Sequence, residues 1–231
     1  MNPSLTSEEL AALGRLDACS LANAIESFQA RLRNEGFADS SVRCIFPKLR
    51  PMVGYAATVK IRGASPPMGS LTYSEQTDWW DYVLSVPAPR VLVVQDVSSK
   101  KSSGALLGEV HVNILRALGC IGAVTDGAVR DLPAIEELRF PLFAANPAVS
   151  HSYVHIVEVG SPVKIGGLEI ASGDLVHGDL NGIQTIPLDL APKLPAVAAA
   201  MTASEQAIIA QCRSPQLKIE QLRAIMAKPR T

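Results

Sequence analysis

The chain has 231 residues, of which 48% are hydrophobic, and its formal charge at pH 7 is −1. That length can bury a substantial core, and no repeat or linker divides it, so we expect a single domain over residues 1–231. The near-neutral charge gives no basic stripe for nucleic acid, and no apolar run reaches the roughly 18 residues of a membrane span. With no secretory signal at the polar, acidic start, a cytoplasmic protein is expected.

The first 51 residues are expected to form helices and a loop ahead of the core. Thr6 followed by Glu9 is typical of a capping box at a helix start. Residues 21–32 have the pattern of a second amphipathic helix, and residues 36–52 are rich in loop signals.

A strand–helix–strand unit is predicted in the middle of the chain, after a strand at residues 54–61 and a short helix at residues 77–85. Residues 90–96 and 121–126 are apolar runs that each end in an acid, and residues 111–118 carry apolar side chains at helical spacing. Two strands joined by a helix form a parallel pair with a right-handed crossover. Their carboxyl ends should lie at one edge of a sheet, where ligands bind in such folds.

Short elements fill the rest of a core that we expect to span residues 52–187, and residues 188–231 should be helical. The predicted elements are a helix at residues 132–138, strands with turns at Gly166-Gly167 and Gly173-Asp174, and helices at residues 194–210 and 216–227. This pattern predicts a mixed α/β fold with a second β layer and flanking N- and C-terminal helices.

Three charged residues fall at the expected edge of the sheet: Glu109, Arg130 and Asp131. The twenty residues between Glu109 and Arg130 are the length of one helix plus one strand, so the two ends return to the same side. A carboxylate pair can hold a hard divalent cation, an arginine can grip a carboxylate or stabilise an enolate, and helix N–H groups around residues 109–111 can bind an anion. This arrangement predicts a site for a metal and a small oxo acid.

Each of these residues also has a structural interpretation. Asp131 could cap the helix that starts at Leu132, because Asp before a proline in the first turn is a common helix start. Arg130 could pair with Asp126 or Asp131. Glu109 could serve only the helix dipole, as many helix N-termini carry Glu.

The histidines are weaker candidates. His111 lies on the first helical turn beside the predicted site and is a candidate substrate contact. His151, His155 and His177 are far apart and show no zinc-ligand spacing, which favours structural roles.

Aromatic, acidic and cysteine side chains elsewhere are expected to be structural. Adjacent Trp79 and Trp80 with Tyr82 could line a pocket or an interface, but packing is their usual role. Asp174 and Asp179 fit ordinary turn chemistry. Cysteines that form no CxxC pair are expected as reduced, mostly buried thiols, and they are Cys19, Cys44, Cys120 and Cys212.

The stretch from Gly108 to Asp131 reads G-E-x8-L-G-x2-G-x-V-T-D-G-A-V-R-D. It resembles the signature of the RraA-like family, which includes 4-hydroxy-4-methyl-2-oxoglutarate/4-carboxy-4-hydroxy-2-oxoadipate aldolases. Two further blocks resemble the same family, FPLFA at residues 140–144 and PVKIGGLEIASGDLVHGDLNGIQTIP at residues 162–187. Several motifs in one order make the resemblance specific, and it covers residues 52–187.

The resemblance implies a swivelling β/β/α fold that assembles as a homotrimer or a dimer of trimers, with sites at subunit interfaces. It implies that Mg²⁺ or Mn²⁺ binds Asp131 directly and Glu109 through water. Arg130 would stabilise the keto oxygen of a small 2-oxo acid, and Val110 and His111 would donate backbone N–H groups to its carboxylate. Asp is common in the family's metabolic aldolases where this chain has Glu109.

The expected function is that of a divalent-metal-dependent lyase, of the class II aldolase type. It would cleave a C–C bond of a 2-oxo acid to give pyruvate through an enolate, with decarboxylation of oxaloacetate as a side activity. The alternative is a non-catalytic regulator, because the family includes proteins that inhibit a ribonuclease by protein–protein contact. The presence of Glu109, Arg130 and Asp131 together favours the enzyme.

Overall fold

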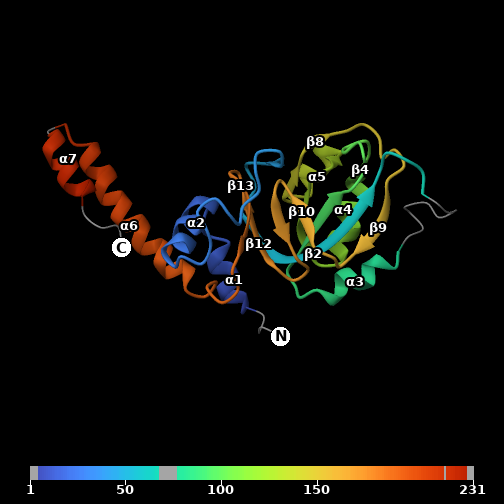
Figure 1. Cartoon of the computed structure of the whole chain (residues 1–231), viewed down its shortest axis with the longest axis horizontal. Coiled ribbons are helices and arrows are strands. Elements are labelled where there is room, and N and C mark those ends of the chain that lie inside the picture. The colour runs from blue at the N-terminus through green and yellow to red at the C-terminus, as the bar shows by residue number, and fades with distance from the viewer. Residues whose placement is uncertain (1–4, 68–76, 216, 228–231) are drawn as a thin grey trace.

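The computed structural model describes residues 5–67, 77–215 and 217–227 (Figure 1). Its centre is an eight-stranded sheet with the strand order β1-β7-β5-β3-β2-β12-β13, in which β9 also pairs with β2. These strands are β1 (Arg43–Cys44), β2 (Met52–Arg62), β3 (Arg90–Asp96), β5 (Cys120–Thr125), β7 (Leu142–Ala144), β9 (His155–Val159), β12 (Leu175–Asp179) and β13 (Gly182–Ile186). Strands β2, β3, β5 and β7 are parallel to their neighbours in that order, and the other pairs are antiparallel.

Two smaller sheets and a set of helices complete the fold. The remaining strands are β4 (Ala105–Leu107), β6 (Ala128–Val129), β8 (Asn146–Pro147), β10 (Val163–Ile165) and β11 (Leu168–Ile170). The helices are α1 (Ser7–Leu13), α2 (Ala18–Ser27), α3 (Trp79–Ser85), α4 (Glu109–Ala117), α5 (Leu132–Glu137), α6 (Leu194–Cys212) and α7 (Ile219–Met226). The mixed α/β class expected from the sequence is confirmed.

The central sheet is covered on both faces. One face packs into a large core that includes Tyr55 and Val59 of β2 together with residues of α1 to α6. The opposite face, including Ala56, packs against the β10–β11 hairpin. Because successive side chains of a strand point to opposite faces, a sheet covered on both sides needs apolar residues at every position, which accounts for the continuous apolar runs.

The predicted elements between residues 90 and 138 are found within two residues of their expected ends. At the N-terminus the capping box is present, since Thr6 Oγ1 accepts from Glu9 N at 3.2 Å and the Glu9 carboxylate accepts from Thr6 N at 2.7 Å. The second helix was predicted too late in the chain. Asp17 caps it by accepting from Ser20 N, and Gln29 ends it with a φ of +53°.

The C-terminal helices extend away from the sheet (Figure 1). Helix α6 contacts α1 and α2 where it begins, and no side chain after Ala198 is buried in α6 or in α7. The structure ends α6 two residues later than predicted, and the predicted start of the last helix, Gln216, lies outside the described residues. None of the described helices meets the length and apolarity needed to cross a bilayer.

The cysteines are free thiols, but the expectation that most are buried is wrong. Cys120 on β5 is buried and Cys44 is half-buried, whereas Cys19 and Cys212 are exposed. The two exposed thiols lie on α2 and at the end of α6, on helix sides that the core does not cover.

His177 lies inside the protein on β12, in agreement with a structural role. Its Nε2 is 3.0 Å from the carbonyl oxygen of Leu16, and because a carbonyl only accepts, Nε2 carries a proton. Nδ1 has no hydrogen-bond partner in the part of the chain that the structure describes. Burial lowers the pKa of His177, against smaller opposing effects of Leu16, Asp179 and Asp17.

This burial predicts a protein that loses stability in mild acid. An unfolded histidine binds a proton below about pH 6.5, whereas folded His177 resists protonation, so the unfolded state takes up more protons as the pH falls. The free energy of unfolding from urea titrations should therefore be lower at about pH 5.5 than at about pH 7.5. His177→Gln, whose Nε2 can still donate to Leu16, should depend less on pH, and an unchanged dependence would contradict this assignment.

Candidate active site

Three short strands that the sequence did not reveal bring the candidate residues together. Strands β4, β6 and β8 form a parallel sheet in which Leu107 lies opposite Val129. Glu109 follows β4, and Arg130 follows β6 and donates its backbone N–H to the Leu107 carbonyl at 3.0 Å. Because the strands are parallel, their carboxyl ends meet at one edge, and the start of α4 lies beside Arg130 and Asp131.

Asp131 reaches across to α4 instead of capping its own helix. Its Oδ2 accepts from Glu109 N at 3.1 Å and lies 3.4 Å from Arg130 Nε. Helix α5 begins at the next residue, yet the Asp131 side chain makes no cap hydrogen bond there. Its backbone is left-handed, with φ +56°, which is uncommon outside glycine, although Asp adopts it more readily than most residues. The helix-cap interpretation of Asp131 is therefore wrong.

Gly108 makes this close approach feasible. A Cβ atom at residue 108 would lie 2.6 Å from Asp131 Oδ2 and 3.1 Å from Arg130 Nε. The φ of Gly108 is −134°, which any residue can adopt, so space alone requires the glycine. Any larger residue would push the carboxylate away from the start of α4.

A cavity of about 260 Å³ opens at this edge of the small sheet. Arg130 and Asp131 line it together with Val110 and His111 of the first turn of α4. Glu109 is not among the described residues that line the cavity; its side chain is exposed, and its backbone N–H is the group that meets Asp131. The structure thus brings together all five predicted site residues, with Glu109 at the rim.

The cavity carries charges of both signs, with the carboxylate of Asp131 beside the guanidinium of Arg130. The first N–H groups of α4 and the guanidinium of Arg130 both favour an anion here. Burial, and after it the charge of Arg130, lowers the pKa of His111, which keeps this imidazole neutral near neutral pH. Arg130 and the start of α4 are therefore the groups of the cavity that would attract a small carboxylate.

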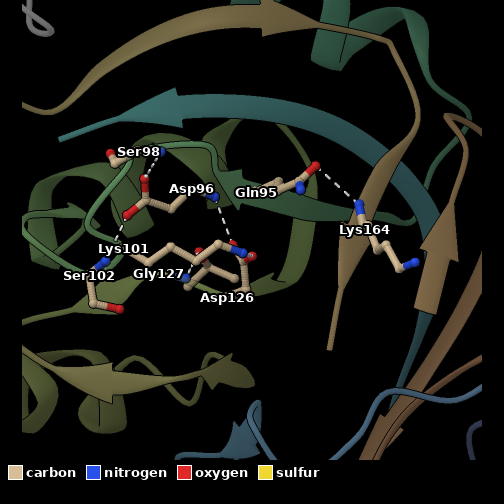
Figure 2. A network of polar contacts seen from close by, with 9 residues as sticks. Gln95, Asp96, Ser98, Lys101, Ser102, Asp126, Gly127 and Lys164 are labelled. Atoms are coloured by element: carbon tan, nitrogen blue, oxygen red, sulfur yellow. Dashed lines mark hydrogen bonds and ion pairs between the residues drawn. The ribbon is translucent and has the colours of Figure 1, made fainter. Parts of the chain in front are cut away.

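A second group of acids, at the carboxyl ends of β3 and β5, is structural (Figure 2). Asp126 accepts from Asp96 N at 2.7 Å and pairs with Lys101 Nζ at 2.5 Å. Asp96 in turn accepts from the backbone N–H groups of Ser98 and Ser102, at 2.9 and 2.8 Å. Burial raises the pKa of Asp126, and Lys101 opposes that shift. These bonds hold the loop before β4, and they show that Asp126 is not the partner of the site arginine.

Two residues that the sequence favoured as structural belong to the cavity. Trp80 and His151 both line it, whereas Trp79 is buried in the core. The sequence could not place His151 near Arg130. The strand that leads to His151, β8, has only two residues and shows no periodic pattern.

The remaining predicted structural residues behave as expected. Asp174 accepts from Ala171 N at 2.8 Å within its turn. Asp179 accepts from Ala18 N at 2.8 Å and from Asn181 N at 2.7 Å, which ties β12 to the start of α2.

The donor set fits a weakly held divalent cation. No group of three or more His, Cys, Asp or Glu side chains that could hold a metal occurs within residues 5–67, 77–215 and 217–227. Mg²⁺, however, is commonly bound by one or two carboxylates, with water and substrate oxygens completing its shell. Both contacts of the Asp131 carboxylate described above engage Oδ2, which leaves Oδ1 available to a cation.

Comparisons with known proteins identify the family that has this fold. The family model described as RraA-like, Aldolase/RraA, matches residues 18–184. The chain therefore belongs to the RraA-like family. A "Putative 4-hydroxy-4-methyl-2-oxoglutarate aldolase" of Halalkalibacterium halodurans is 36% identical over 84 residues, which cover 36% of this chain and 40% of that protein.

Solved structures show the same fold. An uncharacterized protein from Pseudomonas syringae pv. tomato superposes with a TM-score of 0.73 at 24% identity, covering 97% of this chain and 96% of that one. Streptomyces coelicolor RraAS2, described as an unusual member of the RNase ES inhibitor RraA protein family, gives a TM-score of 0.69 at 21% identity, covering 91% and 99%. At these identities the likeness concerns the fold alone.

Proposed function

We propose that this protein is a divalent-metal-dependent lyase that cleaves a C–C bond of a 2-oxo acid to give pyruvate. The observation that carries the proposal is the Asp131 carboxylate, held 3.1 Å from the start of α4 and 3.4 Å from Arg130 at a cavity. Membership of the Aldolase/RraA family and the printed name of the Halalkalibacterium relative support a substrate like 4-hydroxy-4-methyl-2-oxoglutarate. Decarboxylation of oxaloacetate is proposed as a side activity, because it yields the same enolate.

Each site residue has a distinct part in this chemistry. A cation such as Mg²⁺ or Mn²⁺, held by Asp131 and through water by Glu109, supplies Lewis-acid stabilisation of negative charge. Arg130 stabilises the keto oxygen as the C–C bond breaks and charge grows there. The backbone N–H groups of Val110 and His111, which lie in the first turn of α4, bind the substrate carboxylate, because the start of a helix favours an anion.

The same proposal includes assembly into a homotrimer or a dimer of trimers. Beyond Ala198, α6 mixes apolar residues with small polar ones and has Glu205 as its single charged residue, and neither this part of α6 nor α7 buries a side chain. A long helix with few charges and no buried side chain is a candidate for coverage by other protein. Neighbouring copies would cover these helices. Subunit interfaces close to the sites and a cytoplasmic location stay predictions.

Removal of the cation tests the metal requirement. Pyruvate release from oxaloacetate and from 4-hydroxy-4-methyl-2-oxoglutarate, followed by a coupled assay, should stop with EDTA and return with Mg²⁺ or Mn²⁺. Because one carboxylate with waters binds Mg²⁺ weakly, the loss should be quickly reversible. Glu109→Gln should raise the metal concentration needed for half-maximal rate.

Two results would count against the lyase. Full activity after exhaustive chelation would remove the cation from the mechanism. No metal-dependent pyruvate release from either compound, with a protein partner captured instead, would favour the non-catalytic regulator.

A further inference from the structure

His151 lies at the same edge of the small parallel sheet as Arg130 and Asp131. Strand β8 is the third strand of the small parallel sheet, with Pro147 opposite Val129, and the Ala148 N–H donates to the Val129 carbonyl at 2.8 Å. The chain therefore leaves β8 at the edge where α4 starts and reaches His151, which lines the cavity with Arg130 and Asp131. The three parallel strands thus bring the start of α4, the pair Arg130 and Asp131, and His151 to one cavity.

The turn that carries His151 is closely held. Ala105 N donates to the Ser150 carbonyl at 3.1 Å, and Val154 N donates to the His151 carbonyl at 3.1 Å. A Cβ atom on Gly104 would collide with that same carbonyl, so β4 and the turn are in close backbone contact. Ser152 has a φ of +49°, a conformation that persists only where surrounding contacts impose it.

The orientation of the His151 ring follows from its contact with Ser152. Nδ1 is 2.8 Å from the Ser152 carbonyl oxygen, and because a carbonyl only accepts, Nδ1 carries a proton. In the neutral ring the lone pair is then on Nε2, the nitrogen that can gain a proton. A backbone carbonyl that fixes the tautomer in this way is common behind functional histidines.

The proposed reaction needs such a group, because the other side chains of the cavity have other tasks. Arg130 stays protonated and can only donate. Asp131 is engaged with Arg130, with Glu109 N and, in the proposed function, with the cation. His111, in the proposed function, donates its backbone N–H to the substrate carboxylate.

We propose that His151 is the acid/base residue of this site, an assignment that rests on the proposed lyase function. Nε2 takes the proton from the C4 hydroxyl of the substrate as the C3–C4 bond breaks. The hydroxyl oxygen becomes the carbonyl of the released fragment, and the electron pair of the broken bond forms the enolate of pyruvate. The imidazolium then returns its proton to C3 of the enolate, which gives the methyl group of pyruvate and restores His151.

His151→Asn separates this role from a structural one. The Asn amide can still donate to the Ser152 carbonyl from the position of Nδ1, whereas the second ring nitrogen is lost. His155→Asn is the matched control, because His155 Nδ1 makes the same 2.8 Å contact, with the Tyr153 carbonyl, and is not among the residues that line the cavity.

Aldol cleavage and the exchange of pyruvate methyl protons with ²H₂O, followed by NMR, should both fall roughly 100-fold or more in His151→Asn, the usual effect of losing an acid/base group. Decarboxylation of oxaloacetate should fall much less, because its C–C bond breaks without a proton transfer. Calorimetric binding of oxalate, a planar dianion like the enolate, should keep its Kd in the presence of Mg²⁺. Added imidazole should restore part of the exchange in His151→Ala, which a purely structural role would not allow.

The outcomes distinguish the two proposals. A wild-type protein that neither cleaves the substrate nor exchanges pyruvate protons would overturn the lyase, and the role of His151 with it. An active wild type with His151→Asn cleaving and exchanging at the rate of His155→Asn would overturn the role of His151 alone.

Discussion

Asp131→Asn is expected to reduce metal-dependent pyruvate release by more than roughly 100-fold, the scale on which loss of charge stabilisation at an active site acts. The substitution removes the charge that would hold the cation and leaves the size of the side chain unchanged. Asn also tolerates the left-handed backbone found at residue 131, which Ala does not. Initial rates measured across a range of Mg²⁺ concentrations test the expectation.

The control for this variant is Asp174→Asn, which changes a carboxylate that accepts a backbone N–H within a turn and lies outside the cavity. Both variants should elute as the same assembly as the wild type and unfold at similar temperatures. A wild-type rate in Asp131→Asn at limiting Mg²⁺ would show that the carboxylate does not hold the cation.

Arg130→Lys should lower kcat by roughly two orders of magnitude, because a preorganised donor to a developing oxyanion is typically worth that much. Lysine keeps the positive charge but loses the planar fork that orients donors toward Asp131 and toward the substrate oxygen. Steady-state kinetics should show the loss in kcat more than in KM, since the interaction strengthens as the bond breaks.

Arg116→Lys provides the matched comparison, because Arg116 is an exposed residue in the last turn of the same helix, where either cation suits the dipole. It should retain wild-type kinetics. Equal kcat values for the two variants would mean that Arg130 acts only through its charge.

Strands β3 and β5 of the main sheet were predictable because they are long enough to show a pattern. Residues 90–96 and 121–126 are mostly apolar, and in the structure β3 and β5 are parallel neighbours joined through α4. The carboxyl ends of those strands, however, are not the candidate site. They are occupied by the bonded network of Asp96, Lys101 and Asp126 (Figure 2).

The structure places the predicted site residues near one another, but for a different physical reason from the one expected, and their roles stay predictions. Glu109 and Asp131 meet because β4 and β6 pair, and strands of three and two residues are too short for any periodic signal. The same shortness of β8 hid His151, whose place depends on tertiary pairing. The left-handed backbone of Asp131 was equally invisible, because no local sequence pattern marks it.

The tight fit between Gly108 and Asp131 links two positions that are distant in the sequence. A methyl group at residue 108 would occupy the space of the carboxylate, so a mutation there is tolerated only once the acid has been lost or displaced. Among diverging relatives, the glycine should stay fixed wherever the acid at the second position is kept and should drift wherever a smaller residue replaces it. The residue before Glu109 therefore records, in sequence alone, whether a relative retains the geometry of this site.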